Sequence, residues 1–233
     1  MMENNWKRYD FDCLSSTNDW ALANSHLAKE TAVVCVADCQ TKGRGRRGRE
    51  WISPQGNLYM SLLFNSSRLP TDMVYIASLS VAQALKIMVP DIPLQIKWPN
   101  DIMVDGQKIG GILIEKAAND AWVVGIGLNL CSSPLRKDVV YPANNLLSLG
   151  IKIYRDDFIE IYLQQWEKFL QLDFKSIKDL WLRFAYRLGE NVVIKLGSSE
   201  LSGRFIGIDE HGYLLLQQAQ GVKVINTGEI MFS

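Results

Sequence analysis

The apolar residues in the first half of the chain form short unbroken runs and one helical stripe. Residues 31–38 and 58–64 (TAVVCVAD and LYMSLLF) are short and rich in aliphatic and β-branched side chains, so they predict two buried strands. Between positions 73 and 88 apolar residues recur every three or four positions, as they do on one face of a helix. Residues 94–98 predict another short strand, and the hydroxyl residues around Ser16 predict a helix N-terminus.

A hairpin is expected in the middle of the chain. Asp105-Gly106 is a dipeptide typical of two-residue β-turns. Two runs with strand character follow it, at residues 108–116 and 121–130. Because strands joined by short turns run antiparallel, the sheet is expected to be at least partly antiparallel.

The pattern changes at about residue 189. Residues 156–172 and 176–188 predict two amphipathic helices, and Gly189 stands where a glycine commonly ends a helix. The expected fold class is α+β: a mixed, largely antiparallel sheet with flanking helices in a domain at 1–188, followed by a small β-barrel domain at 189–233. The barrel strands are expected at 191–196, 201–208, 213–217 and 222–226.

Composition and charge exclude several classes of protein. The 233 residues are 48% hydrophobic and 21% charged, which is ordinary globular composition and excludes a disordered or collagen-like chain. Twenty-five basic side chains balance 25 acidic ones, so the net charge is zero and no DNA partner is expected. Any basic function has to come from a local patch.

The N-terminus and the cysteines indicate a cytoplasmic protein with free thiols. The first residues contain no apolar signal segment, and the chain has no membrane-spanning run of about 20 apolar residues. The four cysteines form no C-x-x-C pair, and with only two histidines no zinc-ligand spacing exists, so no zinc is expected. All four cysteines are expected to be reduced.

The most distinctive segment is residues 43–49, GRGRRGR. It matches G-x-G-x-x-G, but the sequence Trp51-Ile52-Ser53-Pro54 that follows does not open a helix, as a dinucleotide-binding motif requires. Three interpretations remain: a solvated basic loop, a nucleic-acid phosphate patch, or a mobile flap over an anionic small molecule. The neutral chain favours the flap.

Three further segments carry candidate chemistry. The string KWPND places Lys97 and Asp101 around a rigid corner, which suits phosphate and Mg²⁺ chemistry or forms a plain surface ion pair. In KIGGIL, Lys108 precedes glycines such as Gly110, which leave bare backbone for a ligand or mark an ordinary strand edge. The string GIGLN, which ends at Asn129, indicates either a second ligand-facing strand or a packing constraint.

These four segments in this order resemble the biotin protein ligase family, over residues 16 to about 230. The arginine loop with Gln40 and Trp51, the KWPND string and the K-x-x-G-I-L string are specific as a set. The related lipoate ligases share the fold but lack the Gly-Arg alternation of the loop. The resemblance implies a class II synthetase-like catalytic domain and an SH3-like C-terminal barrel. It also implies that the matching core begins too early to leave room for an N-terminal winged-helix repressor domain.

The activity implied by the resemblance is ATP-dependent ligation of biotin to a lysine of a biotin carrier protein, such as that of acetyl-CoA carboxylase. Biotinyl-5′-AMP is the implied intermediate, with Mg²⁺ as the metal. Two alternatives remain: a lipoate or other acyl ligase with the same adenylation chemistry, or a non-enzymatic phosphate- or RNA-binding module.

The resemblance also assigns roles to individual residues. For biotin the implied residues are Ser16, Thr17, Asn18, Gln40, Gly43, Arg44, Arg46, Lys108 and Gly110. For the nucleotide they are Arg46, Arg49, Trp51, Lys97, Asn100 and Asn129. The implied catalytic residues are Lys108, Arg46 and Asp101, with Asp101 also on the Mg²⁺ side. Residues 143–146 (ANNL) depart from the family's Ala-Thr-Ser-Leu, so no adenine contact is assigned there.

Overall fold

The computed structural model describes residues 6–134 and 143–231. These residues form two compact units. Unit 1 comprises residues up to 70, 109–134 and 144–155. Unit 2 comprises residues 71–108, Ala143 and residues from 156 onward. No helix among the described residues is long and apolar enough to cross a membrane.

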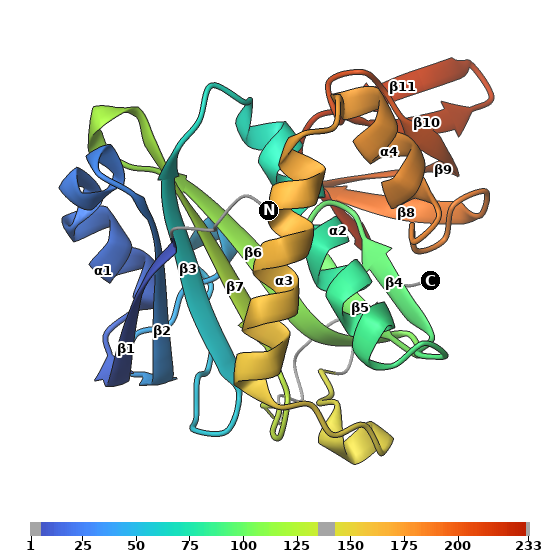
Figure 1. Cartoon of the computed structure of the whole chain (residues 1–233). Helices are drawn as coiled ribbons and strands as arrows, with labels where there is room; N and C mark the ends of the chain where they lie inside the picture. Colours follow the sequence, from blue (N-terminus) through green and yellow to red (C-terminus); the bar gives the residue numbers. More distant parts are fainter. Residues whose placement is uncertain (1–5, 135–142, 232–233) are drawn as a thin grey trace. The chain divides into compact units, whose positions relative to one another are not determined.

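The larger sheet has seven strands in the order β1-β2-β3-β7-β6-β5-β4 (Figure 1). Its strands are β1 (Trp6–Leu14), β2 (Ala32–Gln40), β3 (Leu58–Asn65), β4 (Leu94–Lys97), β5 (Asp101–Val104), β6 (Gln107–Lys116) and β7 (Ala121–Leu128). β1 and β2 run parallel, whereas β2–β3, β3–β7, β6–β7 and β4–β5 are antiparallel. The prediction of a mixed, largely antiparallel sheet is confirmed.

In unit 1, helix α1 (Thr17–Ala23) packs on the sheet that contains β2, β3 and β7. Ser16 is its N-cap, as the sequence predicts, because the Ser16 hydroxyl accepts a hydrogen bond from the Asp19 backbone nitrogen at 3.3 Å. Ala21 and Val33 are fully buried in the shared apolar cluster. This packing fixes the residues at the start of α1 over the sheet.

The expected hairpin turn joins β5 to β6. Asp105 and Gly106 have φ angles of 49° and 70°, the left-handed conformation that a type I′ turn needs at both central residues. An Asp-Gly pair tolerates this conformation, so the turn sets where β6 begins.

The helices of unit 2 are α2 (Pro70–Met88), α3 (Arg155–Leu170, of which unit 2 holds residues 156 onward) and α4 (Phe174–Leu182). The prediction that the last helix runs to residue 188 is wrong. The chain leaves the helix after Leu182 because its backbone pairs with β4: Ile96 N donates to Phe184 O at 2.7 Å, and Tyr186 N donates to Ile96 O at 2.9 Å. Gly189 is left-handed (φ 84°), but it lies well beyond the helix end.

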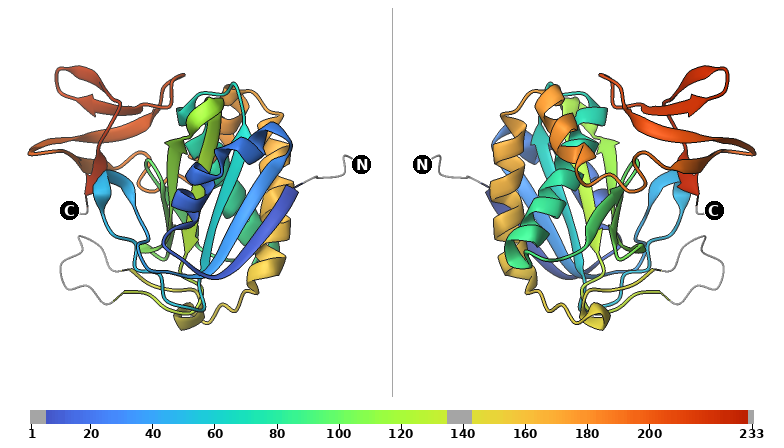
Figure 2. Two further views of the ribbon diagram at one scale, coloured as in Figure 1. Left: turned by 90° about the vertical axis from the view of Figure 1, so that its left-hand side faces the viewer. Right: turned by 90° about the vertical axis from the view of Figure 1, so that its right-hand side faces the viewer.

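The C-terminal strands, orange to red in Figure 2, form a separate sheet. It has five antiparallel strands in the order β11-β10-β9-β8-β12. They are β8 (Asn191–Leu196), β9 (Ser199–Ile208), β10 (Leu214–Gln218), β11 (Gly221–Ile225) and β12 (Glu229–Met231). The four expected strands are confirmed, and β12 is an addition. Within the described residues, β11 and β12 are both edge strands, so this sheet is not closed by strand pairing.

This sheet is joined to α2 by buried polar contacts. The Tyr75 hydroxyl donates to the Gly212 carbonyl at 2.6 Å and accepts from the Trp98 indole at 3.0 Å. Burial raises the pKa of Tyr75, so its hydroxyl stays protonated as a donor. The Trp98 side chain is therefore linked through the Tyr75 hydroxyl to the Gly212 carbonyl, which lies between β9 and β10.

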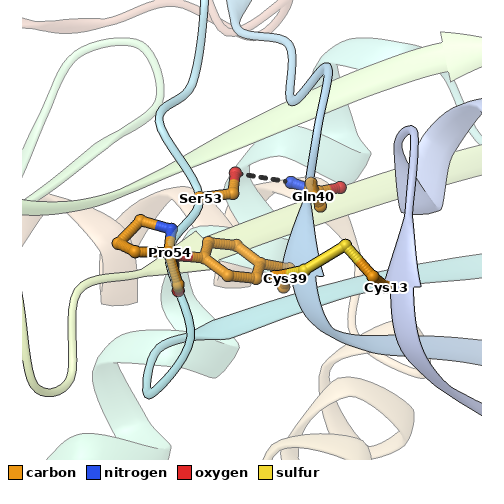
Figure 3. Close-up of a disulfide and its surroundings, with 6 residues drawn as sticks. Cys13, Cys39, Gln40, Ser53 and Pro54 are labelled. Carbon is orange, nitrogen blue, oxygen red and sulfur yellow. Dashed lines mark hydrogen bonds between the residues drawn. A yellow bond between two sulfur atoms is a disulfide. The ribbon is translucent and has the colours of Figure 1, made fainter.

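The cysteines differ from the expectation of four free thiols. Cys13 and Cys39 form a disulfide (Figure 3), while Cys35 and Cys131 are free. The parallel pairing of β1 with β2 places Cys13 opposite Cys39, with Cα atoms 4.7 Å apart, which is within the range for a disulfide. The sequence spacing did not reveal this pair, because it depends on a parallel strand pairing.

Reduction of the Cys13–Cys39 disulfide is expected to lower the free energy of unfolding by about 3–4 kcal/mol, because the bond restricts the unfolded chain across 26 residues. Denaturation with and without dithiothreitol measures this difference.

In the oxidised protein a thiol reagent should modify the exposed Cys131 and spare Cys35, because burial raises the pKa of the Cys35 thiol to about 12. Modification of Cys13 or Cys39 without reductant would contradict the bond.

Candidate functional site

The first group of predicted site residues lies at the start of α1 in unit 1. Ser16, Thr17 and Asn18 are 2%, 4% and 4% exposed, so their polar groups are buried and need partners. The backbone nitrogen of Thr17 donates to Gln40 Oε1 at 2.8 Å, and the Thr17 hydroxyl lies 3.2 Å from the same oxygen. The structure thus brings together four of the predicted biotin residues: Ser16, Thr17, Asn18 and Gln40.

The Gln40 amide is fixed from both ends. Its oxygen accepts from Thr17, and its nitrogen donates to Ser53 Oγ at 2.9 Å (Figure 3). Ser53 in turn donates to the Trp51 carbonyl at 2.8 Å. A Cβ at Gly43 would overlap the Trp51 carbonyl and Ser53, so only glycine fits where the loop crosses this amide.

A second set of contacts holds Asn18. The Ser61 hydroxyl oxygen, on β3, lies 2.6 Å from Asn18 Oδ1 and 2.8 Å from Thr17 Oγ1. The Asn18 side-chain nitrogen donates to Glu115 Oε2 at 2.8 Å. The result is a buried, mostly uncharged network of hydroxyl and amide groups, which suits a neutral polar ligand group.

The arginine loop is a narrow hairpin closed by backbone hydrogen bonds. Gly45 N donates to Arg49 O at 2.7 Å, and Trp51 N donates to Gly43 O at 2.9 Å. The Arg44 guanidinium pairs with Asp19 at 2.6 Å and with both oxygens of Glu115 at 2.9 Å. The predicted site residues Arg46, half-buried, and Arg49, exposed, lie at the start and just after the end of the short 3-10 turn Arg46–Gly48.

The glycines of the GIGLN string make room for side chains of this chain. A Cβ at Gly125 would overlap the Asn18 amide, and one at Gly127 would lie 2.7 Å from the Trp51 ring. Asn129 is buried, and its side-chain nitrogen donates to Asn144 O at 2.9 Å. For Gly125 and Gly127 the packing interpretation is therefore correct: they seat Asn18 and Trp51.

Gly127→Ala is expected to displace Trp51 and to lower the free energy of unfolding by about 1–3 kcal/mol, as overpacking does. Gly127 pairs with Gly111 on β6, so the strand has little freedom to move aside. Thermal unfolding and tryptophan fluorescence measure both effects. Gly45→Ala is the control, because its Cβ would meet only Arg49 at ordinary distance, 3.5 Å. Equal melting temperatures for the two variants would contradict this packing.

The second group of predicted residues lies in unit 2. Lys108 Nζ contacts Asp101 Oδ1 at 2.6 Å, and Lys97 Nζ lies 3.5 Å from Asp101 Oδ2. Glu229 of β12 is a further partner of Lys97, at 3.8 Å. Asn100, half-buried, precedes Asp101 in the turn between β4 and β5.

Burial and the pairing of opposite charges act against each other in this lysine cluster. The Lys97 side chain is fully buried, which lowers its pKa to about 8 against the opposing effect of the Asp101 and Glu229 carboxylates. Burial alone would raise the pKa of Asp101, but the charges of Lys108 and Lys97 outweigh it and hold the pKa below its usual value. Asp101 is therefore an ionised partner of two ammonium groups.

This arrangement does not fit a magnesium ligand at Asp101. Each Asp101 oxygen faces a lysine, and a divalent cation there would stand beside two positive charges. In the part of the chain that the structure describes, no three His, Cys, Asp or Glu side chains come close enough together to hold a metal ion. No catalytic step is assigned here to a metal on Asp101.

Sequence reasoning missed several residues of the two groups. Ser53, Ser61, Asp19 and Glu115 belong to the unit 1 network, and Glu229 belongs to the lysine cluster. Ser61 interrupts the apolar run at 58–64 and is fully buried, so a lone serine in a buried strand was the available signal. Glu115 and Glu229 carry no local signal, because strand pairing brings them to their partners.

The family models and the solved structures show which class of protein this chain resembles. Residues 11–129 match the family described as "Biotin/lipoate A/B protein ligase family", and residues 188–233 match "Biotin protein ligase C terminal domain". The fold is similar to that of a biotin protein ligase from Aquifex aeolicus in complex with biotin and ATP, with a TM-score of 0.82 and 30% identity over 96% of this chain and 97% of that one.

The sequence relatives are more specific. The chain is 34% identical to the biotin--[acetyl-CoA-carboxylase] ligase of Paracoccus denitrificans, over 93% of this chain and 97% of that protein. It is also 34% identical to the bifunctional ligase/repressor BirA of Bacillus subtilis, over 94% of this chain and 72% of that protein. The chain belongs to the biotin protein ligase family.

Proposed function

We propose that this protein joins biotin to a lysine of a biotin carrier protein, at the expense of ATP. The observation that carries the proposal is the buried network of Thr17, Gln40, Asn18 and Ser61 beside the arginine loop. It offers fixed, uncharged donors and acceptors, as the ureido ring of biotin requires. Membership of the biotin protein ligase family supports the same assignment.

Two chemical steps follow from this proposal. A biotin carboxylate oxygen bonds to the α-phosphorus of ATP and pyrophosphate leaves, which gives biotinyl-5′-AMP. The carrier lysine amine then bonds to the acyl carbon, AMP leaves, and the amine loses a proton. Both steps concentrate negative charge, so their catalysis is mainly positioning and electrostatic stabilisation.

Residue roles in these steps are part of the proposal. In this proposal Lys108, at the start of β6, contacts the biotin carboxylate and the α-phosphate, and its contact with Asp101 at 2.6 Å orients its ammonium group. Lys97 supplies a buried positive charge near the nucleotide. The remaining proposed contacts to the nucleotide are those of Arg46, Arg49, Trp51, Asn100 and Asn129. Gly110 has no side chain, so the proposed biotin ligand can approach its backbone closely.

The setting of the reaction is also proposed. Magnesium accompanies ATP as part of the nucleotide substrate, bound by the phosphate oxygens. The reaction takes place in the cytoplasm, and neither DNA nor a membrane is a partner. The ligase domain spans residues 1–188 and the C-terminal domain 189–233, with Glu229 and Gly212 as the C-terminal contacts to Lys97 and Tyr75.

Isotope exchange between pyrophosphate and ATP tests the first step directly. Labelled pyrophosphate should enter ATP only when biotin is present, since adenylate formation is reversible on the enzyme. Lipoate and octanoate are the comparison substrates. Exchange supported by lipoate in place of biotin would indicate the related acyl ligase, and absence of exchange with every acid would indicate a binding module.

A further inference from the structure

One carboxylate of unit 1 is shared between the arginine loop and the buried network. Glu115 lies near the end of β6, and its side chain is 23% exposed. Its Oε2 accepts hydrogen bonds from Asn18 Nδ2 at 2.8 Å and from Arg44 at 2.9 Å, while its Oε1 accepts a second bond from Arg44 at 2.9 Å.

The contact with Glu115 fixes the orientation of the Asn18 amide. A carboxylate only accepts hydrogen bonds, so the Asn18 nitrogen has to face Glu115 and the oxygen has to face Ser61. Leu113 O, 3.4 Å from the same nitrogen, favours this orientation too. The Ser61 proton is then committed to Asn18 Oδ1 at 2.6 Å, so the 2.8 Å contact with Thr17 needs the Thr17 hydroxyl as its donor. Ser61 then competes with Gln40 Oε1, 3.2 Å away, for the single Thr17 hydroxyl proton. Glu115 thereby sets the direction of the hydrogen bonds through to Thr17.

The contact with Arg44 fixes the loop. Two parallel N–H···O bonds join the guanidinium to the carboxylate, and this forked pairing restricts the angle as well as the distance. Asp19 also holds Arg44, at 2.6 Å, but its carboxylate does not contact Asn18. Among these acidic side chains, Glu115 is the one that contacts both the loop and the network.

We infer that Glu115 is a positioning residue that couples closure of the arginine loop to the hydrogen-bond pattern of the biotin pocket. This inference rests on the proposed function and deepens it. Arg44 holds the Glu115 carboxylate through two hydrogen bonds, and a carboxylate held in that place orients Asn18, Ser61 and Thr17 for the ligand. Ligand binding and the Arg44–Glu115 pairing therefore favour each other, as linkage requires.

The test begins with Glu115→Gln. Glutamine has the same size, but it places an N–H group against two donors, Asn18 and Arg44. Biotin affinity, measured by isothermal titration calorimetry, is expected to fall about tenfold or more, as when a charge-assisted bond is lost. Biotin should also protect the loop arginines from trypsin in the wild type and fail to do so in this variant.

Two matched variants separate coupling from simple loop anchoring. Asp19→Asn removes one partner of Arg44 but leaves the Asn18 amide with its Glu115 acceptor, so it should lower biotin affinity clearly less than Glu115→Gln does. Lys116→Gln changes the next residue along β6, which is exposed, and should leave both readouts unchanged. Equal effects of Asp19→Asn and Glu115→Gln would overturn the inference.

A double-mutant cycle supplies the readout that a merely structural role would not move. Arg44→Gln should weaken biotin binding in the wild type and add little in the Glu115→Gln background, because the two residues act together. Additive effects would overturn the inference.

If Glu115→Gln fails to fold, Arg44→Lys replaces it. A lysine keeps the positive charge but cannot form two parallel hydrogen bonds to the carboxylate, so its biotin affinity should lie between those of wild type and Arg44→Gln. Wild-type affinity in Arg44→Lys would then contradict the coupling.

Wild-type pyrophosphate exchange separates this inference from the proposed function. A wild type that shows no biotin-dependent exchange and no biotin binding removes the proposed function, and the inference with it. An active wild type whose Glu115→Gln variant binds biotin normally removes only the role of Glu115.

Discussion

Replacement of Lys108 by alanine is expected to reduce biotin-dependent pyrophosphate exchange by about 10²–10³-fold, the usual cost of removing a group that stabilises charge in the transition state. The Lys108 ammonium is held 2.6 Å from Asp101, so it is oriented before the substrates arrive. Without it, the reaction loses the cation that is proposed to contact both the carboxylate and the α-phosphate as they approach. Biotin binding alone should weaken much less, because the buried network of α1 is intact.

Lys116→Ala is the matched control, since Lys116 is a second lysine on β6 and its side chain is 55% exposed. Exchange by that variant should equal the wild type. Thermal unfolding of Lys108→Ala has to be measured alongside, because Asp101 loses the ammonium group that lies 2.6 Å from its Oδ1, and this loss weakens the cluster. Near-normal exchange by a folded Lys108→Ala would remove Lys108 from the chemistry.

Arg46→Gly is expected to release biotinyl-5′-AMP before the carrier lysine arrives. The adenylate acylates any amine, so an enzyme that makes it has to retain it behind a closed loop. Arg46 is half-buried at the start of the 3-10 turn, and its forked guanidinium suits the adenylate phosphate. Bystander proteins added to the reaction should then be biotinylated on exposed lysines, as detected by streptavidin blotting.

The neighbouring Arg47 provides the control for this variant. Arg47 is exposed and has a φ of 59°, a conformation that glycine adopts readily, so Arg47→Gly removes the same charge without straining the backbone. It should label bystander proteins no more than wild type does. Labelling confined to the carrier in Arg46→Gly, or equal labelling by both variants, would contradict the specific role of Arg46.

Most of the sheet and the helix at 70–88 could be predicted from the sequence, because their apolar periodicity is strong. β1 could not, since it is an edge strand in which charged and aromatic residues mix. Its parallel pairing with β2 also hid the Cys13–Cys39 bond. The predicted last helix is longer than the observed one. Helical spacing in the sequence does not reveal that the backbone of Phe184 and Tyr186 forms hydrogen bonds with the backbone of Ile96.

The candidate site was predicted as separate strings, and the structure joins them into two groups. Ser16, Thr17, Asn18 and Gln40 lie together, as do Lys97, Asp101 and Lys108. Their partners Ser61, Glu115 and Glu229 come from strands distant in the sequence, so no local pattern identifies them. The expectation of a magnesium ligand at Asp101 came from the KWPND string and the family resemblance. Neither shows that the folded chain places Lys97 and Lys108 against the two Asp101 oxygens.

The most direct test of the proposed activity is the mass of a biotin carboxyl carrier domain after incubation with this protein, ATP, magnesium and biotin. We expect a gain of one biotinyl group, located by peptide mapping on a single lysine, and no gain when ATP is omitted or that lysine is replaced by arginine. A carrier that a proven biotin ligase modifies, but that keeps its original mass here or gains a lipoyl group instead, would contradict the account.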